Sequence, residues 1–297
     1  MSAPVILSVG EVLWDLLPTG AVLGGAPANF AAHAQALGGQ AWLASRVGQD
    51  DRGHEILRRL QGRGLSIDLI GVDDSRPTGT VSVTLTTGGE PHYVIHEPVA
   101  WDALSVTTAG KRAAANAQAV CFGSLAQRAP TSRATIRTLV AATPSTALRV
   151  FDLNLRQSFY SREVIASSLA LANVLKLNET ELPVLAAMFS LTGEPKDQLR
   201  ALARRFQLRA VAFTRGADGS CLLVDEAWSE HRGIATRVED TVGAGDSFTA
   251  AFVLGLLAGW PLAKIHERAS EVAAYVCSQV GPMPVLPERF SLRSTGR

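Results

Sequence analysis

Val174-Leu175-Lys176-Leu177 is a short, mostly apolar run that is followed by the helical stretch Lys196–Gln207 and then by Val211-Ala212-Phe213-Thr214. Short apolar runs separated by longer stretches rich in Ala, Leu and Arg are typical of βαβ units, in which helices join parallel strands. The strands of such a sheet are apolar on both sides because helices cover both of its faces. The stretch therefore predicts an α/β fold with a central, mostly parallel sheet.

The same alternation continues over the rest of the chain. The other predicted strands are Val5–Val9, Trp42–Ser45, Val120–Phe122 and Val150–Leu153, and the other predicted helices are Ala28–Leu37, Asp51–Arg63, Thr131–Ala141, Asp246–Ala258 and Leu262–Gln279. No repeat, low-complexity tract or linker rich in Pro and Ser divides the sequence. Because α/β enzymes of about this length often fold as one unit, we expect a single domain over residues 1–297.

One segment departs from this alternation. Thr80–Thr86 alternates between apolar and polar residues, Thr87-Gly88-Gly89-Glu90 has the composition of a turn, and His92–His96 alternates again. This pattern predicts a β-hairpin. A hairpin inserted early in an α/β chain is a candidate lid over a site, and we expect the lid to comprise about residues 12–23 and 78–99.

The overall composition excludes several classes of protein. Of the 297 residues 47% are hydrophobic and the formal net charge is only +1, whereas disordered chains combine low hydrophobicity with high net charge. The 28 basic residues are scattered among 27 acidic ones, so the sequence offers no basic stripe for nucleic acid. We therefore expect a globular protein without a nucleic-acid partner.

The cysteines and the longest apolar segment bear on the location of the protein. Cys121, Cys221 and Cys277 have neither zinc-site spacing nor the even number of a disulfide framework, which favours a reducing cytoplasm. The apolar segment 250–263 contains two glycines and a proline and is shorter than the ~20 residues that span a bilayer. No basic leader precedes the first apolar run, so we expect no signal peptide. These features predict a cytoplasmic protein with no membrane partner.

The segment with the clearest chemistry is Asp240-Thr241-Val242-Gly243-Ala244-Gly245-Asp246-Ser247-Phe248, which leads into a predicted helix. Glycines at a helix N-terminus let backbone N–H groups approach an anion, and the helix dipole favours negative charge there. The segment is neither a Walker A loop, since no Gly-Lys-Ser/Thr follows, nor a dinucleotide fingerprint, since Phe248 replaces the third glycine. The structural alternative is a tight turn with Asp246 as an ordinary acid of the first helical turn.

A second glycine-rich segment, Gly24-Gly25-Ala26-Pro27-Ala28-Asn29, also leads into a predicted helix. Adjacent glycines permit the close approach of a ligand, and the amide of Asn29 in the first turn is free to bind hydroxyl groups. The structural alternative is a plain loop before a helix that begins near a proline.

Together these segments resemble the two sequence patterns of the ribokinase-like (PfkB) carbohydrate kinases, and the chain looks closest to the bacterial fructokinases. The glycine pair with Asn29, followed by Leu37-Gly38 and Val47-Gly48-Gln49-Asp50, resembles the N-terminal pattern, and Asp240–Asp246 resembles the C-terminal one. The further elements, all in the family's order, are Gly10-Glu11 with Asp15, Phe122-Gly123-Ser124-Leu125-Ala126, Asp152-Leu153-Asn154-Leu155-Arg156, Asn178-Glu179-Thr180-Glu181 and Thr214-Arg215-Gly216-Ala217-Asp218-Gly219. The resemblance implies a three-layer sandwich with helices on both faces of the sheet and a small β lid.

The resemblance also implies transfer of the γ-phosphoryl group of ATP to a sugar hydroxyl. Asp246 matches the family's catalytic base, and Gly243, Ala244 and Gly245 match the backbone groups that receive the charge of the transferring phosphoryl group. Phosphoryl transfer requires mainly positioning and charge stabilisation, which a helix N-terminus and Mg²⁺ can supply. The helix dipole is expected to lower the pKa of Asp246.

The remaining site residues are carried over from the family in the same way. The substrate-binding positions are Asp15, Gly24, Gly25, Asn29 and Arg156, and the nucleotide-binding positions are Asn178, Thr214, Gly216, Gly219, Gly243 and Gly245. Glu181 matches a residue that binds Mg²⁺ through water, although Asn178 and Glu181 also have the spacing of a capping box at a helix start. Arg215 stands where the family often has a small or apolar residue. The family further suggests a monovalent cation such as K⁺ and a homodimer formed through the lid.

Several functions remain open at this point. Fructokinase is favoured, with ribokinase, 2-keto-3-deoxygluconate kinase and nucleoside kinase as alternatives within the family. A Rossmann-type oxidoreductase is disfavoured because Ser8-Val9-Gly10-Glu11 lacks the glycine fingerprint after the first strand. A catalytically inactive sugar-binding regulator is the alternative from another class, and the complete Gly-Ala-Gly-Asp run argues against it.

Overall fold

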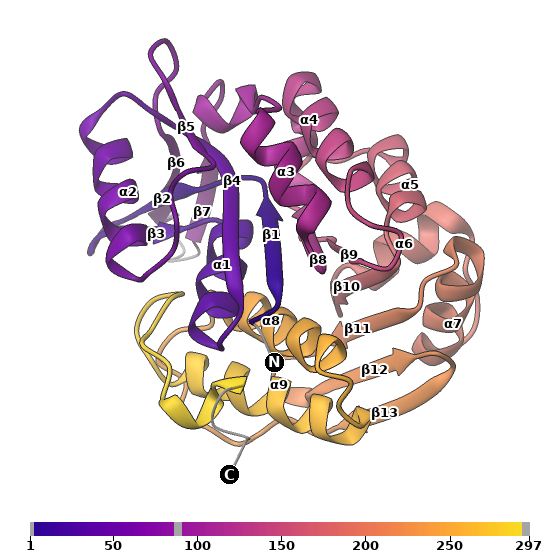
Figure 1. Cartoon of the computed structure of the whole chain (residues 1–297). Helices are drawn as coiled ribbons and strands as arrows, with labels where there is room; N and C mark the ends of the chain where they lie inside the picture. Colours follow the sequence, from indigo (N-terminus) through magenta and orange to yellow (C-terminus); the bar gives the residue numbers. More distant parts are fainter. Residues whose placement is uncertain (1–2, 86–90, 293–297) are drawn as a thin grey trace.

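The central sheet of the computed structural model, which describes residues 3–85 and 91–292, has nine strands (Figure 1). In spatial order they are β13 (Ala227–His231), β12 (Ser220–Val224), β11 (Ala210–Thr214), β10 (Val174–Asn178), β9 (Leu148–Asp152), β8 (Ala119–Gly123), β1 (Val5–Val9), β4 (Gln40–Gly48) and β5 (Ile70–Asp73). The strands from β5 to β11 are parallel, and β12 is antiparallel to both of its neighbours, β11 and β13. The predicted mostly parallel sheet is confirmed.

Helices cover both faces of this sheet and make a three-layer sandwich. One face carries α1 (Ala26–Ala36), α2 (Asp51–Gly62), α8 (Ala244–Leu257) and α9 (Leu262–Cys277), and the other carries α3 (Thr108–Asn116), α4 (Pro130–Ala141), α5 (Arg162–Leu171), α6 (Leu182–Phe189) and α7 (Pro195–Phe206). Successive strand residues point to opposite faces, so Ile6 lies in one hydrophobic core and Leu7 in the other. No helix in the described part of the chain is long and apolar enough to cross a membrane.

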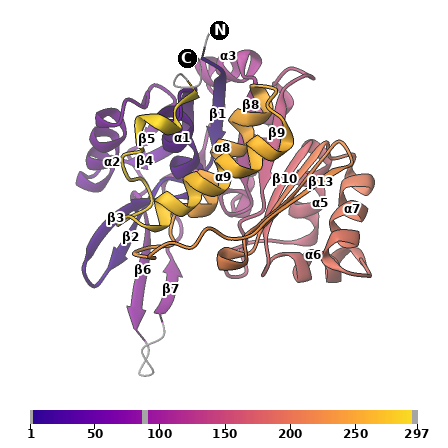
Figure 2. The same cartoon turned by 90° about the horizontal axis from the view of Figure 1, so that it is seen from below.

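A separate sheet of four strands forms beside the sandwich. Its order is β3 (Gly20–Gly24), β2 (Leu13–Leu17), β6 (Gly79–Leu85) and β7 (Pro91–Ile95), so it combines two segments that are far apart in the sequence. The parallel pairing of β2 with β6 joins them, with Leu13 opposite Gly79. Figure 2 shows β6 and β7 projecting away from the sandwich. The predicted antiparallel hairpin is present, and its turn at residues 87–90 lies outside the described residues.

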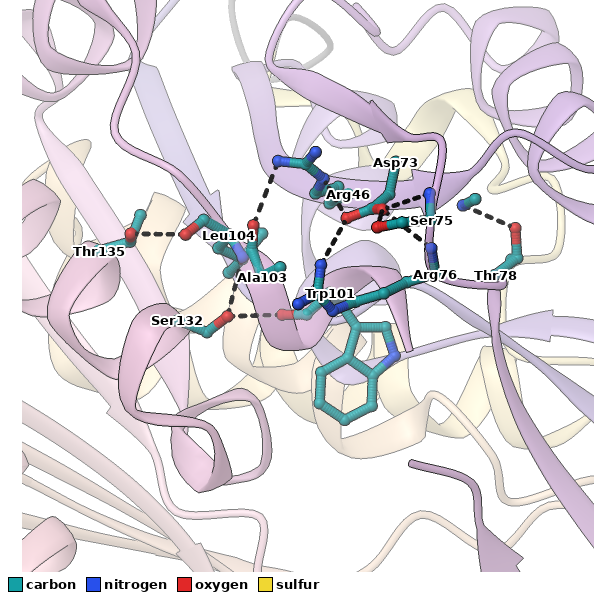
Figure 3. A network of polar contacts seen from close by, with 11 residues as sticks. Arg46, Asp73, Ser75, Arg76, Thr78, Trp101, Ala103, Leu104, Ser132 and Thr135 are labelled. Atoms are coloured by element: carbon teal, nitrogen blue, oxygen red, sulfur yellow. Dashed lines mark hydrogen bonds and ion pairs between the residues drawn. The ribbon is translucent and has the colours of Figure 1, made fainter. Parts of the chain in front are cut away.

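Polar contacts hold the chain where β6 leaves the sandwich, and Figure 3 shows Thr78 together with the neighbouring network of Arg46, Asp73 and Ser75. The Asp50 carboxylate accepts hydrogen bonds from the Thr78 backbone N–H at 2.8 Å and from the Thr78 hydroxyl at 2.6 Å, and it also caps α2 through the Gly53 N–H at 2.7 Å. Nearby, the Arg46 guanidinium pairs with the buried Asp73 carboxylate at 2.9 Å. The start of β6 is therefore fixed to the body.

The end of β7 is fixed by a different set of contacts. The Arg128 guanidinium donates to both carboxylate oxygens of Asp102 at 2.8 Å and to the His96 carbonyl at 2.7 Å. The same guanidinium stacks on the ring of Trp101, 4.0 Å from its centroid. Trp101 also packs so closely on Gly79 that a Cβ there would lie 2.2 Å from the indole nitrogen. Both lid strands thus meet the body at the cluster Trp101, Asp102 and Arg128.

Candidate active site

Polar residues that follow or end four of the parallel strands gather at one edge of the central sheet. Glu11 follows β1, Asp152 ends β9, Asn178 ends β10 and Thr214 ends β11. The carboxyl ends of parallel strands lie at the same edge, which is where open α/β sheets bind their ligands. Helices α1 and α8 pack against each other beside this edge.

A hydrogen bond joins the two glycine-rich segments. The Asn29 side-chain amide donates to Asp246 Oδ2 at 2.7 Å, across 217 positions of sequence. Asn29 is only 3% exposed, and its Oδ1 atom has no hydrogen-bond partner in the protein. The predicted sugar-binding helix and the predicted catalytic residue therefore form one site, with an acceptor left free for a ligand hydroxyl.

The turn before α8 has room for glycine alone at its first position. Gly243 has φ +81°, and a Cβ there would lie 2.4 Å from the Pro282 carbonyl oxygen. Helix α8 begins at Ala244, so the N–H groups of its first turn have no partner within the helix. Gly245 and Asp246 fall in this turn, and the N–H groups there can bind an anion.

The electrostatics of Asp246 correct one expectation from the sequence. The pKa of Asp246 is raised to about 6, mainly by burial and next by the nearby Asp152 carboxylate, while Lys176, the Asn29 hydrogen bond and Arg156 act in the opposite direction. The predicted lowering by the helix dipole is wrong, because loss of solvation and a neighbouring like charge outweigh it.

An ion pair that the sequence analysis did not single out lies next to Asp246. Lys176 Nζ is 3.1 Å from Asp152 Oδ1, and the two side chains are 8% and 7% exposed. Burial lowers the pKa of Lys176, but Asp152, Glu181 and Asp246 more than offset this, so its pKa is raised and the ammonium stays charged. The signal in the sequence is a lysine among the apolar residues of the run 174–177.

The predicted sugar-binding residues of the lid sheet lie close together. Asp15 is on β2 and Gly24 on the paired strand β3, and a Cβ on Gly24 would lie 2.6 Å from Asp15 Oδ2. Gly25 has φ +105° and touches the backbone of Glu11, since a Cβ there would lie 2.7 Å from the Glu11 carbonyl oxygen. Burial raises the pKa of Asp15 to about 6, while Arg156 lowers it and Asp240 raises it. The structure places Asp15, Gly24 and Gly25 together.

Arg156 is exposed and lies near all three acids on the sugar side of the site. Its charge lowers the pKa values of Glu11, Asp15 and Asp246. The guanidinium also donates to the Leu155 carbonyl at 3.1 Å. This position fits the predicted substrate-binding role at the mouth of the site.

Glu11 is a second residue to which the sequence analysis gave no role of its own. It is 2% exposed, and its Oε2 atom has no hydrogen-bond partner. Burial raises the pKa of Glu11 to about 7, against the lowering effects of its own backbone N–H, Arg156 and Arg128 and with the raising effect of Asp246. The sequence showed a glutamate just after a predicted apolar strand, which could have suggested a role in the site. It did not show how deeply the side chain is buried.

Asn178 and Glu181 form the reciprocal bonds of a capping box, as the structural alternative predicted. Asn178 Oδ1 accepts from the Glu181 N–H at 3.0 Å, and Glu181 Oε2 accepts from the Asn178 N–H at 2.8 Å. Glu181 Oε1 accepts from the Leu155 N–H at 2.8 Å. Because both oxygens of this buried carboxylate are already hydrogen-bonded, Glu181 fits contact with a metal ion through water better than direct ligation.

The chemistry of the donors suits Mg²⁺ held mainly by a substrate. Within residues 3–85 and 91–292, no cluster of three His, Cys, Asp or Glu side chains could hold a metal ion alone. Mg²⁺ keeps several of its waters and is usually bound through one or two carboxylates together with substrate phosphates. The residues present therefore fit a magnesium ion that arrives with a triphosphate.

The predicted nucleotide loop lies next to this capping box. The Thr214 carbonyl accepts from the Glu179 N–H at 3.0 Å, and a Cβ on Gly216 would lie 3.6 Å from Glu179 Oε1. Gly219 lies against β13, where a Cβ would overlap the His231 carbonyl oxygen at 2.1 Å. Arg215 turns to Glu230, with which it pairs at 3.0 Å. The predicted residues Thr214, Gly216 and Gly219 thus line one loop at the same edge of the sheet.

Comparison with known proteins gives a consistent result. The model of the pfkB family carbohydrate kinases matches residues 19–289. Fructokinase from Escherichia coli is 29% identical over 316 aligned residues, which cover 99% of this chain and 99% of that protein. The match includes both glycine-rich segments.

Solved structures with the same fold include two at more than a quarter sequence identity. A sugar kinase from Pyrococcus horikoshii in complex with ATP is 27% identical, with a TM-score of 0.81 and coverage of 94% of both chains. Fructokinase from Vibrio cholerae O395, in a form with bound fructose, ADP and calcium ion, is 26% identical, with a TM-score of 0.81 and coverage of 97% of this chain and 96% of that one.

Proposed function

Because the chain belongs to the pfkB family of carbohydrate kinases, and so is a phosphotransferase with a hydroxyl group as acceptor, we propose that its sugar substrate is fructose. The observation that carries the proposed site is the bond between Asn29 and Asp246, which joins the sugar-binding helix to the glycine turn. The fructokinases from Escherichia coli and Vibrio cholerae among its relatives support fructose as the acceptor.

In the proposed reaction Asp246 is the general base. The acceptor hydroxyl oxygen bonds to the γ-phosphorus of ATP, the bond from that phosphorus to the β–γ bridging oxygen breaks, and ADP leaves. The hydroxyl proton passes to the Asp246 carboxylate. A pKa of about 6 suits this role, because the group is ionised at neutral pH yet accepts a proton more readily than an ordinary aspartate.

The other residues bind and orient the reactants in this proposal. Asp15 and the free Oδ1 of Asn29 accept hydrogen bonds from sugar hydroxyls, and the glycines of both segments let the ligands approach the backbone. The N–H groups of the first turn of α8 stabilise the charge on the transferring phosphoryl group.

On the nucleotide side, we propose that Asn178 and the loop from Thr214 to Gly219 bind ATP. Mg²⁺ would neutralise the charge of the triphosphate, and Glu181 would hold the ion through water. A monovalent cation such as K⁺ is part of the same proposal.

The proposal extends to the whole protein. We propose one kinase domain over residues 1–297 in the cytoplasm, with the four-stranded sheet as a lid that closes over the sugar. A homodimer through the lid is supported by two large apolar side chains on β7, Tyr93 and Val94, which are 52% and 39% exposed. Sedimentation equilibrium of the wild type and of the variant Tyr93→Lys tests this proposal. We expect the wild type to be a dimer and the variant to be a monomer.

The substrate is tested by measuring ADP release with Mg²⁺ and ATP over a panel of acceptors. The panel contains fructose, ribose, 2-keto-3-deoxygluconate, adenosine and fructose 6-phosphate, each also assayed with Asp246→Asn. The highest kcat/KM is expected for fructose, with turnover lost in the variant. A higher kcat/KM for another acceptor would overturn the assignment of fructose as the substrate. Sugar binding without ADP release in the presence of any acceptor would indicate an inactive regulator.

A further inference from the structure

A buried ion pair lies next to the first turn of α8, which follows the glycine turn of the site. Lys176 is in the middle of β10 and Asp152 is the last residue of the neighbouring strand β9, and their charged atoms are 3.1 Å apart. Both side chains are less than a tenth exposed. Burying two charges costs free energy even when they pair, so the pair is not simply a way of stabilising the fold.

The pair touches α8 at its first turn. A Cβ on Gly245 would lie 3.0 Å from Lys176 Nζ, so the ammonium lies against the residue before Asp246. On the other side, the Thr249 hydroxyl donates to the Gly245 carbonyl at 2.8 Å and lies 3.5 Å from Asp152 Oδ2. The pair therefore contacts the first turn of α8 directly, next to Asp246.

Five ionisable groups face Asp246 from the elements packed around it. They are Glu11 after β1, the Cys121 thiol on β8, Asp152 at the end of β9, Arg156 just beyond it, and Lys176 on β10. Burial raises the pKa of Cys121 well above its usual value, so the thiol stays neutral. Arg156 is exposed to solvent, and Lys176 is therefore the buried positive charge among them.

We propose that Asp152 and Lys176 are positioning residues that hold the first turn of α8 and set the pH at which Asp246 becomes a base. This inference rests on the proposed role of Asp246. Lys176 favours the ionised form of Asp246 and Asp152 opposes it, so the two charges act on the base in opposite directions. The lysine lets Asp246 be buried among carboxylates and still be ionised at neutral pH.

Three variants test the pair through the pH dependence of kcat/KM with fructose. Lys176→Met removes the favourable charge and is expected to move the acidic limb of the profile up by about one pH unit. Asp152→Asn removes the unfavourable charge and is expected to move the limb down by about the same amount. The double variant removes both of the opposing charges, and its limb is expected to return close to that of the wild type.

A matched control removes one partner of an ion pair outside the site. Arg46 pairs with the buried Asp73 at 2.9 Å near the base of the lid, and Arg46→Met is expected to leave the acidic limb unchanged. A phosphate group also titrates near pH 6, but ATP is common to all variants, so the shift between variants carries the information. Circular dichroism and thermal unfolding establish that each variant is folded.

The outcomes separate this inference from the proposed function. Opposite shifts of the limb in the two single variants support it. A folded Lys176→Met variant with an unmoved limb would overturn it, whether kcat falls, as for a purely structural pair, or only the KM for ATP rises, as for a phosphate ligand. Should Asp246→Asn keep wild-type turnover, the base role itself would be wrong. Should Asp246→Asn be inactive while the limb stays unmoved in Lys176→Met, only the role of the pair would be lost.

Discussion

Asp246 has the strongest individual test at the scale of single residues. Asp246→Asn keeps the size of the side chain and its position next to Asn29, but the amide cannot act as a base. We therefore expect kcat to fall by about 10²–10⁴-fold. Calorimetric Kd values for fructose and ATP should change little. Asp225→Asn, at an exposed turn between β12 and β13, is the control and should keep full activity. A kcat for Asp246→Asn above about a tenth of the wild type would remove it from the base role.

Asp15 is expected to act on sugar binding rather than on chemistry. Its carboxylate lies beside Gly24 on the lid sheet, where it can accept hydrogen bonds from two hydroxyl groups. Asp15→Ala should weaken the calorimetric Kd for fructose by about tenfold or more, since a hydrogen bond to a charged group contributes about 1.5–3 kcal/mol. The Kd for ATP should be unchanged. Loss of ATP affinity with normal fructose affinity would contradict the assignment.

Glu11 makes stability depend on pH in a predictable direction. Its pKa is raised from 4.5 to about 7 in the folded protein, so folding favours the protonated form and this stabilisation is lost as the pH rises from 4.5 through about 7. At pH 8 the buried carboxylate costs about 3 kcal/mol of unfolding free energy, and at pH 5 it costs little.

The variant Glu11→Gln removes this cost. Denaturant unfolding should show it to be more stable than the wild type at pH 8 and nearly equal at pH 5. The control is Glu267→Gln, which changes an exposed glutamate on α9. It should change the free energy of unfolding by the same amount at both pH values. If the Glu11→Gln difference were independent of pH, the carboxylate would not titrate between these values in the fold.

At the scale of elements, the lid sheet carries a prediction about motion. Its strands are fixed where they join the body, at Thr78 and at His96, but β6 and β7 project beyond it. Closure over the sugar would shield the reacting phosphoryl group from water. Hydrogen exchange should show added protection of amides in 79–85 and 91–95 when fructose is present, and none in α7, which serves as the control. Equal protection with and without fructose would leave the hairpin as ordinary edge structure.

The elements also show what the sequence could and could not predict. Continuous apolar runs predicted β1 and β10, and longer helical patterns predicted α2 and α8, all to within two residues at each end. Helices α3, α5 and α6 were not predicted. Each has ten residues or fewer, and so short a stretch shows little more than two turns of periodicity.

In the site, too, the sequence predicted residues that stand in a local pattern and missed residues that depend on distant neighbours. Asp246, Asn29 and Gly25 stand in glycine-rich segments that form local sequence patterns, so the resemblance of these patterns to those of the family indicated a role for each residue. Lys176 and Glu11 matter because of what surrounds them in space, and burial by distant elements does not appear in a local pattern. The pKa of Asp246 was predicted in the wrong direction for the same reason, since Asp152 approaches it from 94 positions away in the sequence.

At the scale of the whole molecule, the lid sheet and the glycine turn come from distant parts of the sequence. The lid strands β2, β3, β6 and β7 come from the first third of the chain, whereas the glycine turn and Asp246 come from its last fifth. The two parts meet where α1 packs on α8. The groups that we propose to bind sugar and those that we propose to bind the phosphoryl group thus reach one edge of the sheet from opposite ends of the sequence.

The bond between Asn29 and Asp246 has a consequence for the order in which the protein is made. A ribosome adds about 5–20 residues per second, so Asp246 is synthesised on the order of 10–40 seconds after Asn29. During that interval β1, β4 and β8 can assemble, but the apolar side of α1 has no α8 to cover it. The nascent chain therefore exposes the apolar side of α1, which molecular chaperones can bind, and the contact between Asn29 and the proposed base forms only late in synthesis.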